Sequence, residues 1–173
     1  MNDDYDKKFY GKFRGTVTDN NDPQQTGRLQ LQVPDVAGEI PATWALPCLP
    51  FTGDQSGFFV VPAVGSLVWV EFEQGDPDYP IWTGCFWGSS EEMPTAASQG
   101  SPGTQQVVIQ TEEGNQLVIS DMAGAEGGIQ LESSGGAKIT VTDSGITIDN
   151  GQGAKITLNG SSVSINDGAL QVS

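Results

Sequence analysis

The sequence predicts an all-β protein in two parts: a small closed barrel, then a repeat of strands that can bury its apolar face only when three chains combine. Three observations support this prediction. All aromatic residues lie at or before Trp87, although the chain has 173 residues. Its last third repeats with a period of 17 residues. Apolar and polar residues alternate in both parts, which is the period of a β-strand.

The N-terminal part is predicted to be a charged flexible arm, residues 1–8, followed by a barrel at residues 9–87. Alternating runs occupy Phe9–Thr18, Gly27–Val33 and Ser66–Glu73, and turn residues separate them. A shorter run at 44–49 and another at 79–86 bring the number of predicted strands to about five. Five short strands in about 80 residues fit the size of an OB-fold barrel, and no helix is needed.

Residues 88–104 are dense in Gly, Ser and Pro and lack periodicity, which predicts a linker. The repeat follows at residues 105–173. Gly136–Val141, for example, recurs 17 residues later as Gly153–Leu158. Fixed-period repeats are typical of stacked architectures.

Each strand of the repeat offers only about two large aliphatic side chains to one face, which is too little for an isolated sheet to offset its ordering entropy. We therefore predict a trimeric triple-stranded β-helix, a needle whose aliphatic side chains point inward. A single-chain solenoid is the alternative. With about eight strands per chain spread over three faces, the needle would be on the order of 40 Å long. The predicted trimer core consists of Leu117, Ile119, Ile129, Leu131, Ile139, Val141, Ile146, Ile148, Ile156, Leu158, Val163 and Ile165.

Composition excludes several functions. The net charge is −15 with only seven Lys and Arg, which argues against nucleic-acid binding because phosphate recognition needs clustered cations. The acidic start predicts no secretory signal, and no apolar run could span a bilayer, so we expect synthesis in the cytoplasm. Cys48 and Cys85 lie in apolar sequence, so in that reducing compartment we expect buried free thiols. A disulfide or a metal pair is the alternative, which no spacing supports.

Several segments of the barrel resemble the OB-fold of phage baseplate spikes and of the tip proteins of type VI secretion and related contractile injection systems. They are Tyr10–Gly15, Asp22–Pro23 with Gly27–Arg28, Val33–Pro34, Trp44–Ala45, Pro62–Gly65 and, most specifically, Val68–Gly84. The repeat is similar to the trimeric needle that these proteins carry.

The resemblance implies a rigid homotrimeric spike of a phage-tail-like particle, which sits on a baseplate hub and pierces a target envelope. The chain begins at the barrel, so we expect the hub to be a separate protein. The sequence contains no His, so the histidine iron site of some relatives cannot be carried over, and we expect no metal or cofactor. A small tip-capping protein is expected to cover Leu170 and Val172, which would otherwise expose an apolar last layer.

The signature residues of the barrel are expected to have structural roles rather than catalytic ones. They are Gly65, Gly75, Asp76, Pro77, Asp78 and Pro80.

We expect no enzymatic activity, because the sequence offers no His and no nucleophile with a neighbouring base. Glu112 and Glu113 would point to opposite faces of a strand, and Glu91 and Glu92 lie in the predicted linker. The alternative function is a tail-fibre-like module that binds a surface glycan. Its aromatic platform would be formed by Trp44, Trp69, Trp82 and Trp87.

Overall fold

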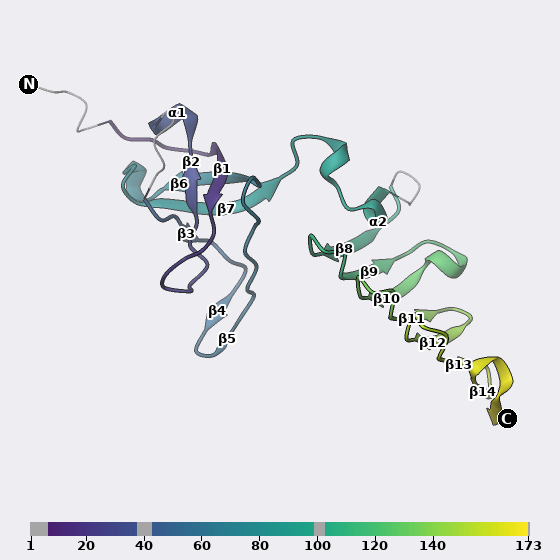
Figure 1. The fold of residues 1–173 in the computed structure, drawn as a ribbon. Coiled ribbons are helices and arrows are strands. Elements are labelled where there is room, and N and C mark those ends of the chain that lie inside the picture. Colours follow the sequence, from purple (N-terminus) through teal and green to yellow (C-terminus); the bar gives the residue numbers. More distant parts are fainter. Residues whose placement is uncertain (1–6, 38–42, 99–102, 173) are drawn as a thin grey trace, which may run out of the picture. The chain divides into compact units, whose positions relative to one another are not determined.

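The computed structural model describes residues 7–37, 43–98 and 103–172, so most of the predicted arm 1–8 and part of the predicted linker 88–104 lie outside the described residues. The chain divides into two compact units, residues 1–90 and 91–173. Both units consist mainly of β-strands (Figure 1), which confirms the predicted all-β class.

The N-terminal unit is built on a five-stranded sheet with the order β2-β1-β6-β7-β3. Its two outer strands approach each other where Leu29 and Ala45 exchange a pair of backbone hydrogen bonds of 3.1 and 2.8 Å. This bridge joins the two edges and closes the sheet into a barrel, which removes the exposed edges that an open sheet would present. The strands are β1 (Phe13–Asp19), β2 (Gln30–Gln32), β3 (Leu46–Pro47), β6 (Leu67–Phe72) and β7 (Pro80–Phe86).

Alternate residues of these strands fill the barrel, because successive side chains of a strand point to opposite faces. In β6, Val68, Val70 and Phe72 point inward and are buried. Trp82 of β7 is also buried, and its indole Nε1 donates a 3.1 Å hydrogen bond to the carbonyl of Gly27. The remaining buried hydrophobic residues are Val17, Leu29, Leu31, Val33 and Ala45.

The expectation that the chain contains no helix is wrong at two short segments. Helix α1 (Pro34–Ala37) begins at a proline, whose fixed φ suits the first helical position and whose missing N–H needs no partner there. Helix α2 (Thr95–Ser98) lies within the predicted linker. Single 3₁₀ turns occupy Glu73–Gly75, Ser90–Glu92, Gly124–Glu126 and Asn166–Gly168. Among the described residues, no helix is long and apolar enough to cross a bilayer.

A small hairpin projects from the barrel between β3 and β6 (Figure 1). It is formed by β4 (Thr52–Gly53) and β5 (Ser56–Gly57), which pair antiparallel around a two-residue turn.

The C-terminal unit is a single eight-stranded antiparallel sheet in which every strand lies next to its neighbour in the sequence. Figure 1 shows the strands following one another like rungs. Their bounds are β8 (Gln106–Gln110), β9 (Gln116–Ser120), β10 (Gly128–Glu132), β11 (Lys138–Thr142), β12 (Gly145–Asp149), β13 (Lys155–Asn159), β14 (Ser162–Ile165) and β15 (Leu170–Val172).

This arrangement corrects the expectation that the strands of one chain are spread over three faces. Asp143 and Ser144 alone connect β11 to β12, and Gly160 and Ser161 alone connect β13 to β14. Two-residue connections force consecutive strands to pair as hairpins within one sheet. One chain therefore supplies one continuous face of eight strands.

Two glycines are required where neighbouring strands approach closely. Gly128 (φ +92°) and Gly145 (φ +144°) lie at the starts of β10 and β12. A Cβ atom at Gly128 would overlap the carbonyl of Val141, and one at Gly145 would overlap the carbonyl of Leu158. These overlaps with backbone atoms explain why the 17-residue repeat carries glycine at both positions.

Candidate assembly surface

Two columns of aliphatic side chains cross the eight-stranded sheet on one of its faces. Cross-strand pairing places Val141 beside Ile129 and Ile146, and Ile139 beside Leu131 and Ile148. The same pairing extends through every strand of the unit. The first column contains Val107, Ile119, Ile129, Val141, Ile146, Leu158 and Val163, and the second contains Ile109, Leu117, Leu131, Ile139, Ile148, Ile156, Ile165 and Leu170.

The columns are only partly buried within one chain. Their exposed members retain between 37% (Ile146) and 55% (Leu170) of their accessible surface. A hollow of about 900 Å³ runs along the second column and is lined by Ile109, Ile139 and Ile165 among others. A contiguous apolar face of this extent is rare on a protein that stays monomeric. Completing the burial of one such side chain is worth about 1 kcal/mol, since full burial is worth about 1.5–3 kcal/mol.

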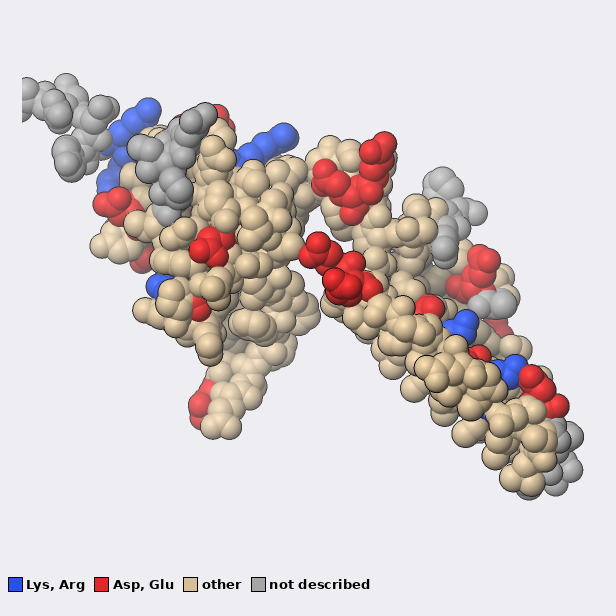
Figure 2. Space-filling view, viewed as in Figure 1, with Lys and Arg blue, Asp and Glu red and all other residues tan. Residues whose placement is uncertain are grey.

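From β10 to β14 the opposite face of the same sheet is polar, whereas on β8 and β9 it also carries Val108 and Val118. Thr140, Thr147 and Thr157 lie directly opposite one another on neighbouring strands. At one side of this face, Glu132, Lys138, Asp149 and Lys155 alternate in charge across four paired strands. Opposite charges placed across strands stabilise one pairing register. In the C-terminal unit of Figure 2, blue side chains accordingly lie among red ones.

The alternating charges end in an ion pair at the last turns of the sheet. Lys155 Nζ lies 2.9 Å from Asp167 Oδ1. The hydrogen bond to Asp167 raises the pKa of Lys155 above its ordinary value, and the charges of Asp167 and Asp149 act in the same direction. The backbone N–H of Lys155 also donates a 2.9 Å bond to Asn166 Oδ1, which fixes this turn to the neighbouring strand.

All twelve residues predicted for the trimer core lie on the two columns, and their role in a trimer stays a prediction. Sequence reasoning missed Val107 and Ile109, which extend both columns onto β8 and are each 51% exposed. Val107, Val108 and Ile109 form an uninterrupted apolar run, so alternation alone did not reveal which of them share the face of the columns. Leu170 continues the second column to the last strand, whereas the side chain of Val172 lies outside the described residues.

The signature residues of the barrel form turns rather than a catalytic cluster. Gly65 and Gly75 have φ values of +91° and +77°. The Asp76 carboxylate accepts a 3.1 Å hydrogen bond from the backbone N–H of Asp78 and a 3.2 Å bond from Lys8 Nζ. Both bonds lower the pKa of Asp76, and the bond from the Asp78 N–H has the larger effect. Pro80 is fully buried at the start of β7, and Pro77 lies in the same turn between β6 and β7.

A buried ion pair in the barrel was missed from the sequence. Arg28 donates two bonds, of 3.0 and 2.7 Å, to Asp22 Oδ1, and the backbone N–H groups of Gln24 and Thr26 donate to the same carboxylate. The side chains of Asp22 and Arg28 are 3% and 17% exposed. The Arg28 guanidinium holds the pKa of Asp22 far below its usual range. The carboxylate thus fixes the loop between β1 and β2, a role that short-range sequence patterns do not reveal.

The four tryptophans do not share one platform. Trp82 is buried, Trp44 lies under the Arg28 guanidinium, and Trp69 lies under that of Arg14. Trp87 is 57% exposed. The observations therefore favour no sugar-binding surface made of all four rings.

Glu112 and Glu113 lie in the turn between β8 and β9 and not in the strand that was expected. The chain turns there because Gly114 has φ +86° and its N–H donates a hydrogen bond to the carbonyl of Thr111.

The expectation that Cys48 and Cys85 are buried is wrong: both are exposed free thiols. Cys48 follows the very short β3, and Cys85 is the penultimate residue of β7, so both lie where the packed layer ends. No group of His, Cys, Asp and Glu in the described parts of the chain could hold a metal ion.

Each of the two units matches a known protein family. Residues 13–87 match the type VI secretion system/phage-baseplate injector OB domain, and residues 106–171 match the phage baseplate V C-terminal trimerisation domain. The chain belongs to the spike family of phage baseplates and type VI secretion systems. The two aliphatic columns lie within the second match, so the C-terminal unit of this baseplate spike chain is a trimerisation domain.

Two similar proteins come from Vibrio cholerae serotype O1. The actin cross-linking toxin VgrG1 is 33% identical over 109 residues, and the type VI secretion system spike protein VgrG3 is 32% identical over 109 residues. Each alignment covers 58% of this chain and 10% of the relative. The spike chain thus corresponds to a small part of these relatives.

Proposed function

We propose that three copies of this spike chain assemble through the two aliphatic columns into a rigid needle. The observation that carries the proposal is the continuity of both columns across the strands of the sheet, on a face that stays about two-fifths exposed in one chain. Three such faces turned toward a common axis would bury each other's aliphatic side chains and leave the threonine face in water. The charged columns would then lie on the outside, where ions are well solvated.

The shape of the proposed assembly suits a mechanical role. Each face contributes eight strands, so at about 4.8 Å per strand the needle would be close to 40 Å long. Its core would contain six aliphatic side chains per layer, two from each chain, with short hairpin turns at the edges. Such a prism resists bending because every backbone group within it is hydrogen bonded to a neighbouring strand. We propose a spike that is pushed through the envelope of a target cell, with no catalytic step on this chain.

The barrel is proposed to seat the spike on a baseplate hub. Support comes from the family of its OB domain, which is that of baseplate injectors. The test is co-purification of the spike chain with a candidate hub protein encoded beside it. Retention of the spike on the hub through a wash in high salt supports the proposed contact. Failure of the spike to bind any hub from the same gene cluster contradicts it.

A separate capping protein is proposed at the end of the needle. Leu170 on the last strand is 55% exposed, and three copies would form an apolar layer open to water. The test is a pull-down with a candidate tip protein. Leu170→Asp and Val172→Asp should abolish capture, whereas Gln171→Asp, on the alternate position of the strand, should not. Capture that survives both apolar substitutions would place the contact elsewhere.

A further inference from the structure

The hairpin arm, residues 51–60, is an exposed apolar projection of the barrel. Every residue of it is exposed, including Phe51 (59%), Phe58 (42%) and Phe59 (67%). The arm is held in shape by its own ladder, including a 3.1 Å bond from the Phe58 N–H to the Phe51 carbonyl. Three exposed phenylalanines on a formed hairpin indicate a docking element, since single exposed apolar residues are common but clusters are not.

A second feature of the barrel is a guanidinium held over two aromatic rings. The Arg14 guanidinium lies 5.7 Å from the Trp69 ring and 5.4 Å from the Phe86 ring, and the rings themselves are 4.6 Å apart. Arg14 and Trp69 are cross-strand partners on β1 and β6. Arg14 is exposed, and none of the ion pairs among the described residues of the barrel involves it. Stacking fixes the guanidinium plane and leaves its in-plane donors available for a carboxylate.

The hairpin arm and this aromatic rack (Arg14, Trp69 and Phe86) are chemically complementary. The arm carries a single charge, Asp54, in the turn between β4 and β5, with phenylalanines on its flanks. The rack offers the opposite charge beside two flat apolar rings. A carboxylate meets a stacked guanidinium in a bidentate pair, and aromatic rings pack on one another with favourable offset geometry.

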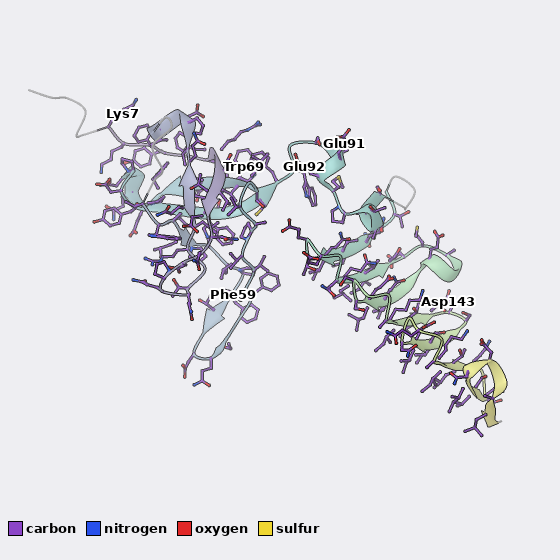
Figure 3. All side chains as sticks on the ribbon, viewed as in Figure 1. Lys7, Phe59, Trp69, Glu91, Glu92 and Asp143 are labelled. Carbon is purple, nitrogen blue, oxygen red and sulfur yellow. The ribbon has the colours of Figure 1, made fainter. Side chains whose placement is uncertain are left out.

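Within one barrel the two features lie apart, as the positions of Phe59 and Trp69 in Figure 3 show. If the two patches meet, they therefore meet between two copies of the chain. A trimerisation domain ties three barrels together, which raises the effective concentration of each arm at a neighbouring rack. A contact between two different patches closes into a ring when the copies are related by rotation.

We infer that the hairpin arm of each barrel docks across the aromatic rack of the next barrel, with Asp54 paired to Arg14 of that copy. The inference rests on the proposed homotrimer. It assigns the arm to the spike itself, whose three barrels would form a closed ring.

The test is photo-crosslinking on the full chain. The chain carrying Phe59→p-benzoylphenylalanine is assembled into trimers from a mixture of ¹⁴N- and ¹⁵N-labelled copies, so that crosslinks between copies are recognised by mass. The expected product joins residue 59 to a peptide containing Trp69 or Phe86 of another copy. Tyr79→p-benzoylphenylalanine, at a position of similar exposure (62%), is the control and should not yield this product.

Charge reversal tests the proposed pair. Arg14→Glu and Asp54→Arg should each lower the crosslink yield about tenfold, and the double variant should restore it. Asp54 lies on the exposed arm, so its substitution leaves the barrel core intact even if Arg14→Glu disturbs folding. Light scattering on the same samples separates the two proposals: a monomer contradicts the homotrimer, whereas a trimer without crosslinks to the rack overturns the docking and assigns the arm to a different partner.

Discussion

Substituting one residue of the aliphatic columns tests the orientation of the sheet. Ile148 lies between Ile139 and Ile156 on the second column and is 43% exposed in one chain. Its adjacent residue Thr147 lies on the opposite, polar face between Thr140 and Thr157. Ile148→Asp and Thr147→Asp make the same change in charge one residue apart, so any difference between them reports the face and not the charge.

The magnitude follows from the exposed fraction. Completing the burial of Ile148 is worth about 1 kcal/mol per chain, hence about 3 kcal/mol per trimer. Its loss alone weakens assembly about 100-fold, at 1.4 kcal/mol per factor of ten. Each buried carboxylate adds a desolvation cost of several kcal/mol, and three of them would face one another near the axis. Ile148→Asp should therefore abolish the trimer at micromolar concentration.

Sedimentation velocity over a range of concentrations measures this effect. The Thr147→Asp chain should sediment as the wild-type chain does, because its carboxylates remain in water. Equal tolerance of both substitutions would refute the assignment of the inward face, and loss of the trimer in Thr147→Asp alone would reverse it.

Two further substitutions test the barrel and the turns. Because the pKa of Asp22 is far below its usual range, the Asp22–Arg28 pair stabilises the barrel above about pH 4, and this stabilisation is lost as the pH falls further. Asp22→Asn should lower the urea concentration at the midpoint of unfolding, followed by tryptophan fluorescence at pH 7, and make this midpoint less dependent on acid pH. An unchanged acid dependence would contradict the assignment. Gly145→Ala should lower the thermal unfolding midpoint of the sheet, measured by circular dichroism, more than Gly153→Ala does. Only the Cβ atom added at position 145 would meet a backbone carbonyl, that of Leu158. The reverse ranking would show that the close approach of the strands is unimportant.

The sequence predicted the columns because their signal is local. Alternation in Ile139-Thr140-Val141 fixes which side chains share a face, and the 17-residue period repeats that assignment along the needle. It did not predict that one chain forms one face, although the two-residue turn at Asp143 and Ser144 carried that information.

Two features of the barrel were beyond reach of the sequence. The Asp22–Arg28 pair depends on the conformation of the loop between β1 and β2, where backbone N–H groups also bond the carboxylate. The stack of Arg14, Trp69 and Phe86 needs the register of three strands. Burial of the cysteines was inferred from their apolar neighbours, but position at the end of a strand decides exposure. Local pattern therefore identifies the repeat well and the loops of the barrel poorly.

The mass of the full chain in solution tests the central claim most directly. One chain has a mass of 18.2 kDa. Assembly through the aliphatic columns requires three copies, so multi-angle light scattering at micromolar concentration should give about 55 kDa, three times that value. A mass near 18.2 kDa for the folded full-length chain would contradict the account.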